Sequence, residues 1–140
     1  MLGLTKKQFL KRSKGCLEET GNHALLIREL LIHETDGNIK NNEAYNQIKL
    51  IMNGIESNFY RYEQLNPPSR CVSIHLKILN CLIVLQESAA ANYDYINAVI
   101  DGQIATEKLE ESRILLGKFR KEFRPLTTEI EELLNHKHNK

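Results

Sequence analysis

The fold is decided by residues 69–100, SRCVSIHLKILNCLIVLQESAAANYDYINAVI. Apolar positions recur there with alternating steps of three and four residues, which is typical of a helix that buries one face. The positions on this stripe are Val72, His75, Leu79, Leu82, Gln86, Ala89, Tyr93, Ile96 and Ile100. Flanking positions are also apolar, namely Leu76, Ile78, Ile83, Leu85 and Ala90. The pattern predicts a long helix that is the most enclosed element of the molecule.

Breaks on both sides bound this helix. Asn66-Pro67-Pro68 precedes it, and proline disfavours helical geometry in the residue before it. We expect Ser69 to cap the helix start and Asp101-Gly102 to end the helix, with glycine in the left-handed conformation.

Three further helices are expected around it, at residues 6–34, 43–64 and 104–135. In residues 43–64, which Asn42 is expected to cap, the stripe is Tyr45, Ile48, Met52, Ile55, Phe59 and Tyr62. In residues 104–135 it is Leu109, Ser112, Leu116, Phe119, Phe123, Leu126, Ile130 and Leu133. This last stripe keeps its phase through Pro125, which predicts a kinked but continuous helix. Residues 6–34 are less regular: Thr5 and Gln8 form an expected capping box, whereas Gly15 and Gly21 favour a bend or break.

The chain of 140 residues has 41% hydrophobic and 26% charged residues, which is the composition of one globular domain. Similar long helices joined by short connections pack side by side with opposite directions. We therefore predict a single all-α domain, residues 1–140, as an up-down-up-down antiparallel bundle of four helices with coiled-coil-like packing.

Charge and cysteine content limit the setting. The formal net charge is only +1, so no overall field concentrates nucleic acid or acidic lipid around the molecule. Three cysteines without paired spacing, Cys16, Cys71 and Cys81, argue against a disulfide framework. No segment reads as a signal peptide or an integral membrane span. We expect a cytoplasmic protein; the alternative is the extracytoplasmic membrane surface, if an export signal was trimmed.

Two groups of residues on the central helix are candidate sites. Leu76, Ile83 and Ala90 form a second apolar face, which either three neighbouring helices cover or a second copy or partner helix contacts. His75, Gln86 and Ser112 interrupt apolar stripes and form a candidate polar site in the core.

These core residues have a structural and a functional interpretation. We expect His75 to bond to Thr127 or Thr128 and to pack on Phe59, as a core histidine does. Gln86 and Ser112 either fix helix register or line a small cavity that admits a ligand.

No pattern specific to catalysis, metal or nucleotide binding is present, so we expect neither an enzyme nor a cofactor. Glu-x-x-His pairs, glycine-rich phosphate loops and Gly-x-Ser-x-Gly elbows are absent from the sequence. Cys71, beside Arg70, is the more reactive thiol candidate, although a structural thiol is the simpler interpretation. Basic clusters occur at residues 6–14 and 118–124. The bundle brings the first cluster close to Glu129, Glu131 and Glu132, and mutual neutralisation is a simpler interpretation than nucleic-acid binding.

The stretch Leu65-Asn66-Pro67-Pro68, followed seven residues later by His75, resembles uncharacterised helical-bundle proteins of Gram-positive bacteria, some of them lipid-anchored outside the membrane. The resemblance extends over residues 43–135. It implies a bacterial bundle without known catalysis and assigns no functional residue. The chain departs from the anchored members because it lacks an export signal and the lipid-attachment cysteine context.

These observations favour a non-enzymatic protein-interaction or structural bundle, whose partner is another protein or a second copy in a homodimer. The alternative is a small-molecule or lipid sensor with its ligand in the bundle core.

Overall fold

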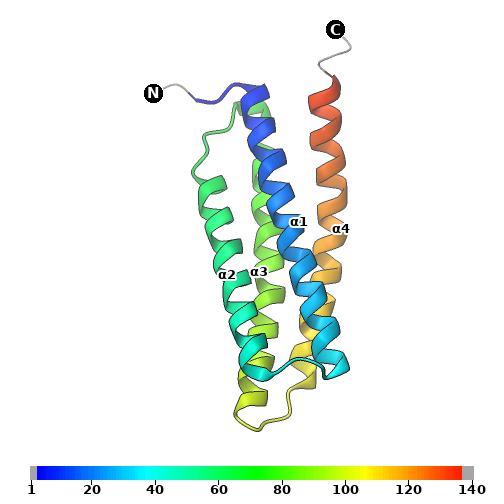
Figure 1. Ribbon diagram of the computed structural model, residues 1–140. Coiled ribbons are helices and arrows are strands. Elements are labelled where there is room, and N and C mark those ends of the chain that lie inside the picture. Colours follow the sequence, from blue (N-terminus) through cyan, green and yellow to red (C-terminus); the bar gives the residue numbers. More distant parts are fainter. Residues whose placement is uncertain (1–2, 137–140) are drawn as a thin grey trace.

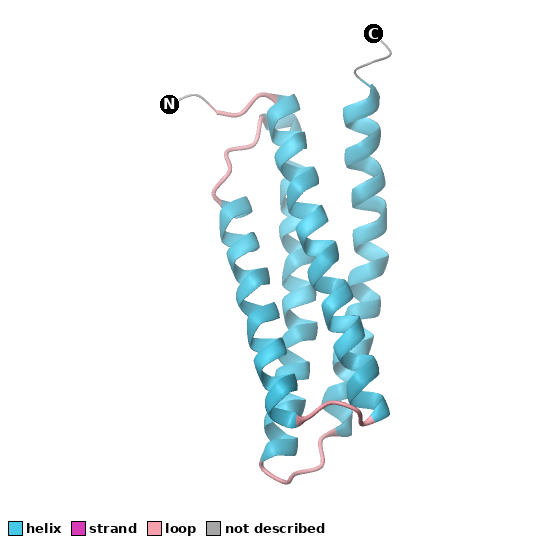
Figure 2. Cartoon of the chain, in the orientation of Figure 1, coloured by secondary structure: helices cyan, strands magenta, loops and turns pink. Residues whose placement is uncertain are grey.

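The computed structural model describes residues 3–136, which form four long α-helices and contain no strand. The helices are α1 (Lys6–Asp36), α2 (Asn41–Glu63), α3 (Val72–Ile100) and α4 (Thr106–His136), with a short 3₁₀ turn, η1 (Ser69–Cys71), before α3. They lie alongside one another (Figure 1), and only short loops separate them (Figure 2). The all-α prediction is therefore confirmed.

The first helix begins at its predicted cap and ends at a glycine, two residues beyond the predicted bound. The Thr5 side chain accepts from the Gln8 backbone N–H and the Gln8 side chain accepts from the Thr5 N–H, which is the expected capping box. Gly37 closes α1 with a left-handed φ of 69°. The predicted bend or break at Gly15 and Gly21 does not divide the helix, because α1 runs unbroken from Lys6 to Asp36.

Two predicted caps are wrong. α2 begins at Asn41, so Asn42 lies inside the first turn, and its N-cap Lys40 makes no side-chain capping bond. Ser69 starts the 3₁₀ turn, in which the Cys71 N–H donates to Pro68 O at 2.8 Å, and α3 begins only at Val72. The tight turn after Pro67-Pro68 thus takes the place of the expected side-chain cap.

α3 ends at the expected residues, and α4 continues through its proline. Gly102 has a φ of 78°, in the left-handed region, just after α3 ends. Pro125 lies inside α4, which is one continuous helix from Thr106 to His136. Register therefore persists through the proline, as the apolar stripe predicted.

The core gathers around α3. Its buried side chains point to most sides of the helix, and α1, α2 and α4 all pack against it. The largest fully buried side chains are Phe9, Phe119, Leu10, Ile27, Leu30, Ile48, Ile55, Ile78, Leu82, Leu85, Ile130 and Asn92. A fully buried asparagine in this set is unusual, because a buried amide needs hydrogen-bond partners.

Polar contacts join the helices at several levels. Between α1 and α2, Ser13 Oγ lies 2.6 Å from Tyr62 Oη. About two turns further along α1, Asn58 Nδ2 donates to Thr20 Oγ1 at 2.9 Å. These bonds satisfy buried groups and specify which residues face each other.

Candidate functional site

The structure separates the three residues of the predicted core polar site. His75 is buried, and its Nε2 lies 2.9 Å from the backbone oxygen of Tyr62. Its ring packs on those of Tyr62 and Phe9, with centroid distances of 4.7 and 5.5 Å. The histidine is thus held by aromatic neighbours and one carbonyl.

The predicted partners of His75 are therefore wrong. The turn between α2 and α3, including η1, places Tyr62 rather than Phe59 at its level. Thr127 Oγ1 instead donates to Arg124 O within α4. A small offset in a turn changes every facing pair along two helices. The length of the turn between α2 and α3 therefore determines which residue faces His75.

Gln86 and Ser112 bond to different helices. Gln86 Nε2 donates to Met52 O of α2 at 3.2 Å. Ser112 Oγ donates to Ser88 O, and Ser88 Oγ donates to Ser112 O, both at 2.8 Å, so the two serines tie α3 to α4 reciprocally. The three residues thus bond to different parts of the protein and do not converge on one site, and Gln86 Oε1 is buried without a partner among the described residues.

The predicted face of α3 is accessible along part of its length. Leu76 is 55% exposed and Ile83 is 43% exposed, whereas Ala90 is only partly exposed. Val72, 43% exposed, extends this row by one turn. The row is therefore an apolar stripe that the three neighbouring helices leave uncovered.

A groove of about 280 Å³ runs beside this stripe between α2 and α3. It is lined by Ile55, Glu56, Phe59, Tyr60, Leu82, Ile83, Gln86, Glu87 and Ala90. Sequence reasoning missed the contribution of α2, because Phe59 was assigned to the core and Tyr60 lies off the stripe. Tyr60 is 53% exposed, and its ring packs against the Phe59 ring in a T-shaped arrangement. Two apolar surfaces thus meet at this groove, which we call the α2–α3 groove.

Two carboxylates, Glu56 and Glu87, line the same groove. The ion pairs within the described part of the chain are Arg61–Glu19, Lys108–Glu111 and Arg113–Glu110. Neither groove carboxylate belongs to one of them. The α2–α3 groove therefore has an apolar interior with negative charge at its rim.

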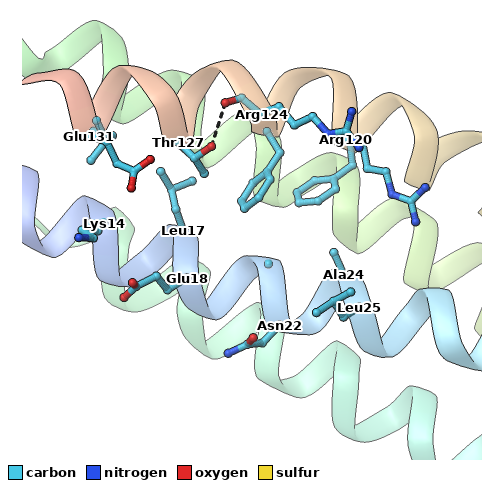
Figure 3. Close-up of a pocket in the computed structure, with 14 residues that line it drawn as sticks. Lys14, Leu17, Glu18, Asn22, Ala24, Leu25, Arg120, Arg124, Thr127 and Glu131 are labelled. Carbon is cyan, nitrogen blue, oxygen red and sulfur yellow. Dashed lines mark hydrogen bonds between the residues drawn. The ribbon is translucent and has the colours of Figure 1, made fainter.

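A second groove of about 470 Å³ lies between α1 and α4 (Figure 3). Phe119 and Phe123 of α4 line it together with residues of α1, and their rings stack with centroids 4.9 Å apart. A Cβ on Gly21 would lie 3.3 Å from the Phe123 ring, so the glycine lets the ring approach α1 closely.

The charges around this second groove are mixed. Lys14, Arg120 and Arg124 line it together with Glu18 and Glu131. Lys14 belongs to the basic cluster at residues 6–14, and Glu131 is one of the glutamates that we expected to neutralise this cluster. No ion pair within 4.0 Å joins Lys14 to Glu131 in the structure of residues 3–135. Both signs occur together, so this groove does not favour a ligand of one charge.

The thiols lie in the interior. Cys16, Cys71 and Cys81 are free and buried. Burial raises the pKa of Cys16 and of Cys81 to about 12, so their nucleophilic thiolate forms are scarce at neutral pH. Within the described residues, no group of three or more His, Cys, Asp or Glu side chains is placed to hold a metal ion.

One helix of the described chain, Ser69–Ile100, is long and apolar enough to cross a membrane by length and composition alone. Half of its most apolar window is buried within the protein. The core helix of a water-soluble bundle has the same properties, so this finding is weak evidence for a membrane span.

Comparison with protein-family models, with curated proteins and with solved structures finds no match for this chain. The resemblance to helical-bundle proteins of Gram-positive bacteria stays an expectation. The functional argument therefore depends on the geometry of the residues themselves.

Proposed function

We propose that this chain is a non-enzymatic interaction module, in which an up-down-up-down antiparallel four-helix bundle presents the α2–α3 groove to a helix of a partner protein. The observation that carries the proposal is the exposed apolar stripe of α3, continuous with the aromatic side chains of α2.

The order of the polar contacts supports the antiparallel arrangement. Along α1, Ser13 precedes Thr20, whereas their partners on α2 run from Tyr62 back to Asn58. Between α2 and α3 the order also reverses, since Tyr62 faces His75 and Met52 faces Gln86. Short connections of this kind make sequential helices antiparallel.

The spacing of the stripe suits a docked helix. Leu76, Ile83 and Ala90 are seven residues apart, so they stay in line along α3 and match the repeat of an amphipathic partner. Exposed large apolar side chains on a continuous surface are typical of binding sites, and aromatic residues such as Tyr60 are enriched at them.

The rim charge selects the partner's chemistry. Glu56 and Glu87 lie on α2 and α3, on opposite walls of the groove, and each lacks an ion pair in the part of the chain described. Charge complementarity across an interface speeds association and excludes wrong partners. We therefore propose an amphipathic helix with Leu or Ile on one face and Lys or Arg on its flanks.

A designed peptide of about three heptads, with Leu at a and d and Lys at the flanks, tests this site by fluorescence anisotropy. The same peptide with Glu in place of Lys is the charge control. We expect the Lys peptide to bind more tightly, and the double variant Glu56→Lys, Glu87→Lys to reverse the preference.

Ile83→Asp should weaken binding of the Lys peptide by roughly tenfold or more, because it places a charge in the apolar row. Ile114→Asp is the matched control, since Ile114 is 64% exposed on α4, away from the groove. Equal effects of the two substitutions would remove the α2–α3 groove as the site. A dimer in light scattering that Ile83→Asp dissociates would instead assign the groove to a second copy.

The remaining features of the proposal depend on buried residues outside the groove. A cytoplasmic setting is supported by three buried cysteines that are free in the structure. An α3 that packs in the bundle, rather than across a membrane, is supported by its buried polar residues Ser88 and Asn92. The sensor alternative has less support, because His75 and Ser112 already bond to protein groups.

A further inference from the structure

An unusual polar pair lies where the end of α1 meets α3. Asn92 of α3 is 0% exposed, and its Nδ2 donates to Oε1 of Glu34 in the last turn of α1 at 2.7 Å. The remaining polar atom of each side chain, Glu34 Oε2 and Asn92 Oδ1, is a buried oxygen that has no hydrogen-bond partner among the described residues.

Glu34 Oε2 and Asn92 Oδ1 both lack a hydrogen-bond donor. An ionised carboxylate and an amide carbonyl are both acceptors only, so neither can satisfy the other. A buried acceptor without a donor costs free energy, and the cost is larger for a charged group. A single proton on the carboxyl group supplies the missing donor.

We propose that Glu34 and Asn92 form a proton-binding site, in which a neutral Glu34 carboxyl group and the Asn92 amide are joined by two hydrogen bonds. The Asn92 Nδ2–H donates to Glu34 Oε1, and the added Oε2–H donates to Asn92 Oδ1. The proton comes from solvent as the site closes and returns to solvent when Glu34 ionises.

The surroundings of Glu34 favour the neutral form. Burial raises its pKa from an ordinary value of 4.5 to about 7, and the Asn92 hydrogen bond offsets only part of this rise. Glu34 also lies near the C-terminus of α1, where the helix dipole disfavours negative charge.

The charged groups on the adjoining elements either have other partners or belong to no ion pair of the described residues. On α1, His33 Nδ1 lies 2.9 Å from Asn38 Oδ1, and Asp36 belongs to no ion pair of the described residues. From α2, Lys49 Nζ lies over the Tyr93 ring of α3. From α4, Arg113 donates to Glu110 and to Thr35. None of these groups forms an ion pair with Glu34 in the described residues.

The site makes this end of the bundle sensitive to alkali. Because the pKa is raised on folding, its stabilising contribution is complete below about pH 4.5 and is lost as pH rises through about 7. Ionisation then leaves a buried carboxylate against the Asn92 carbonyl oxygen, which loosens the contact between the last turn of α1 and α3. The protonated pair therefore holds the end of α1 against α3, and deprotonation weakens this contact.

Glu34→Gln tests the proposal, because its amide can donate to Asn92 Oδ1 and accept from Nδ2 at every pH. From about pH 5.5 to about pH 8.5, the folding equilibrium constant of the wild type should fall roughly thirtyfold relative to that of this variant. Glu29→Gln on the exposed face of α1 is the matched control. Its folding equilibrium constant should depend on pH as that of the wild type does. Equilibrium urea unfolding measures all three proteins.

Carbon NMR of the Glu34 side-chain carboxyl in the wild type gives an independent measurement that needs no variant to fold. A titration midpoint near pH 7 supports the site. A midpoint near 4.5, or a Glu34→Gln protein with the same pH profile as the wild type, would mean that Glu34 is ionised and that water satisfies the two oxygens. Either result overturns the proposal.

Discussion

Gly54 of α2 lies beneath the imidazole of His23 from α1, and this contact makes a sharp test of how the two helices pack. A Cβ on Gly54 would overlap His23 Nε2 and lie 3.0 Å from Cε1 and 3.3 Å from Cδ2. The ring is partly buried, and its Nδ1 is buried without a hydrogen-bond partner among the described residues. Gly54→Ala therefore forces the ring, or one of the helices, to move.

Two opposing terms determine the size of the effect. In a helix interior, alanine is favoured over glycine by about 1 kcal/mol. Inserting a methyl group into an occupied space costs about 1–3 kcal/mol. We expect Gly54→Ala to lower the free energy of unfolding by about 1 kcal/mol in the wild type, and to raise it by about 1 kcal/mol when His23→Ala has removed the ring. The coupling between the two sites is then about 2 kcal/mol.

Urea unfolding of the four proteins of this double-mutant cycle measures the coupling. Gly117→Ala is the matched control, since a Cβ there has no neighbour within 4 Å and the residue also lies inside a long helix. It should stabilise the protein by about 1 kcal/mol. If Gly54→Ala stabilises as much as Gly117→Ala does, the imidazole does not occupy the space over Gly54 and the reasoning is refuted.

Three further results are expected. Tyr62→Phe should lower the free energy of unfolding by about 1–2 kcal/mol, because the Ser13 hydroxyl is then buried without its partner; an added Ser13→Ala should recover part of this loss, and a full loss in both proteins would contradict the account. Burial lowers the pKa of His23 below 6.5, so its contribution to stability is present above pH 6.5 and is lost as pH falls; His23→Gln should abolish this acid dependence in pH-resolved unfolding. Cys16 and Cys81 should resist iodoacetamide in the native protein and react rapidly in urea, as mass spectrometry would report; rapid native labelling would show that they are accessible.

The helices could be predicted because their signals are local. An apolar step of three and four residues, the pair Thr5 and Gln8, and the glycine at position 102 act within one or two turns. The persistence of the stripe through Pro125 likewise predicted a continuous α4, because register is a property of the helix itself.

The two failed cap predictions concern places where local signals compete. Asn42 and Ser69 are good capping residues, yet α2 starts before the first of them and a 3₁₀ turn includes the second. The backbone conformation at a helix start depends on where the preceding chain comes from, which residue type alone does not determine.

The sequence predicted the α3 side of the groove but not the α2 side. The helical repeat placed Leu76, Ile83 and Ala90 on one line of α3, and the structure leaves the first two of them exposed. It could not indicate that Phe59 and Tyr60 form the opposite wall, because that depends on the rotation of α2 about its own axis. The pairing of Glu34 with Asn92, 58 residues apart, has no signal in the sequence at all.

By itself, then, the amino-acid sequence determined that this is an all-α protein with four long helices, since burial of one apolar stripe per helix is a local and periodic requirement. Only the tertiary structure decided which side chains meet. A shift of a few residues in a turn, or a rotation of one helix, changes every facing pair while it leaves each stripe buried. The α2–α3 groove and the Glu34–Asn92 pair therefore exist only because these helices have packed in one particular register.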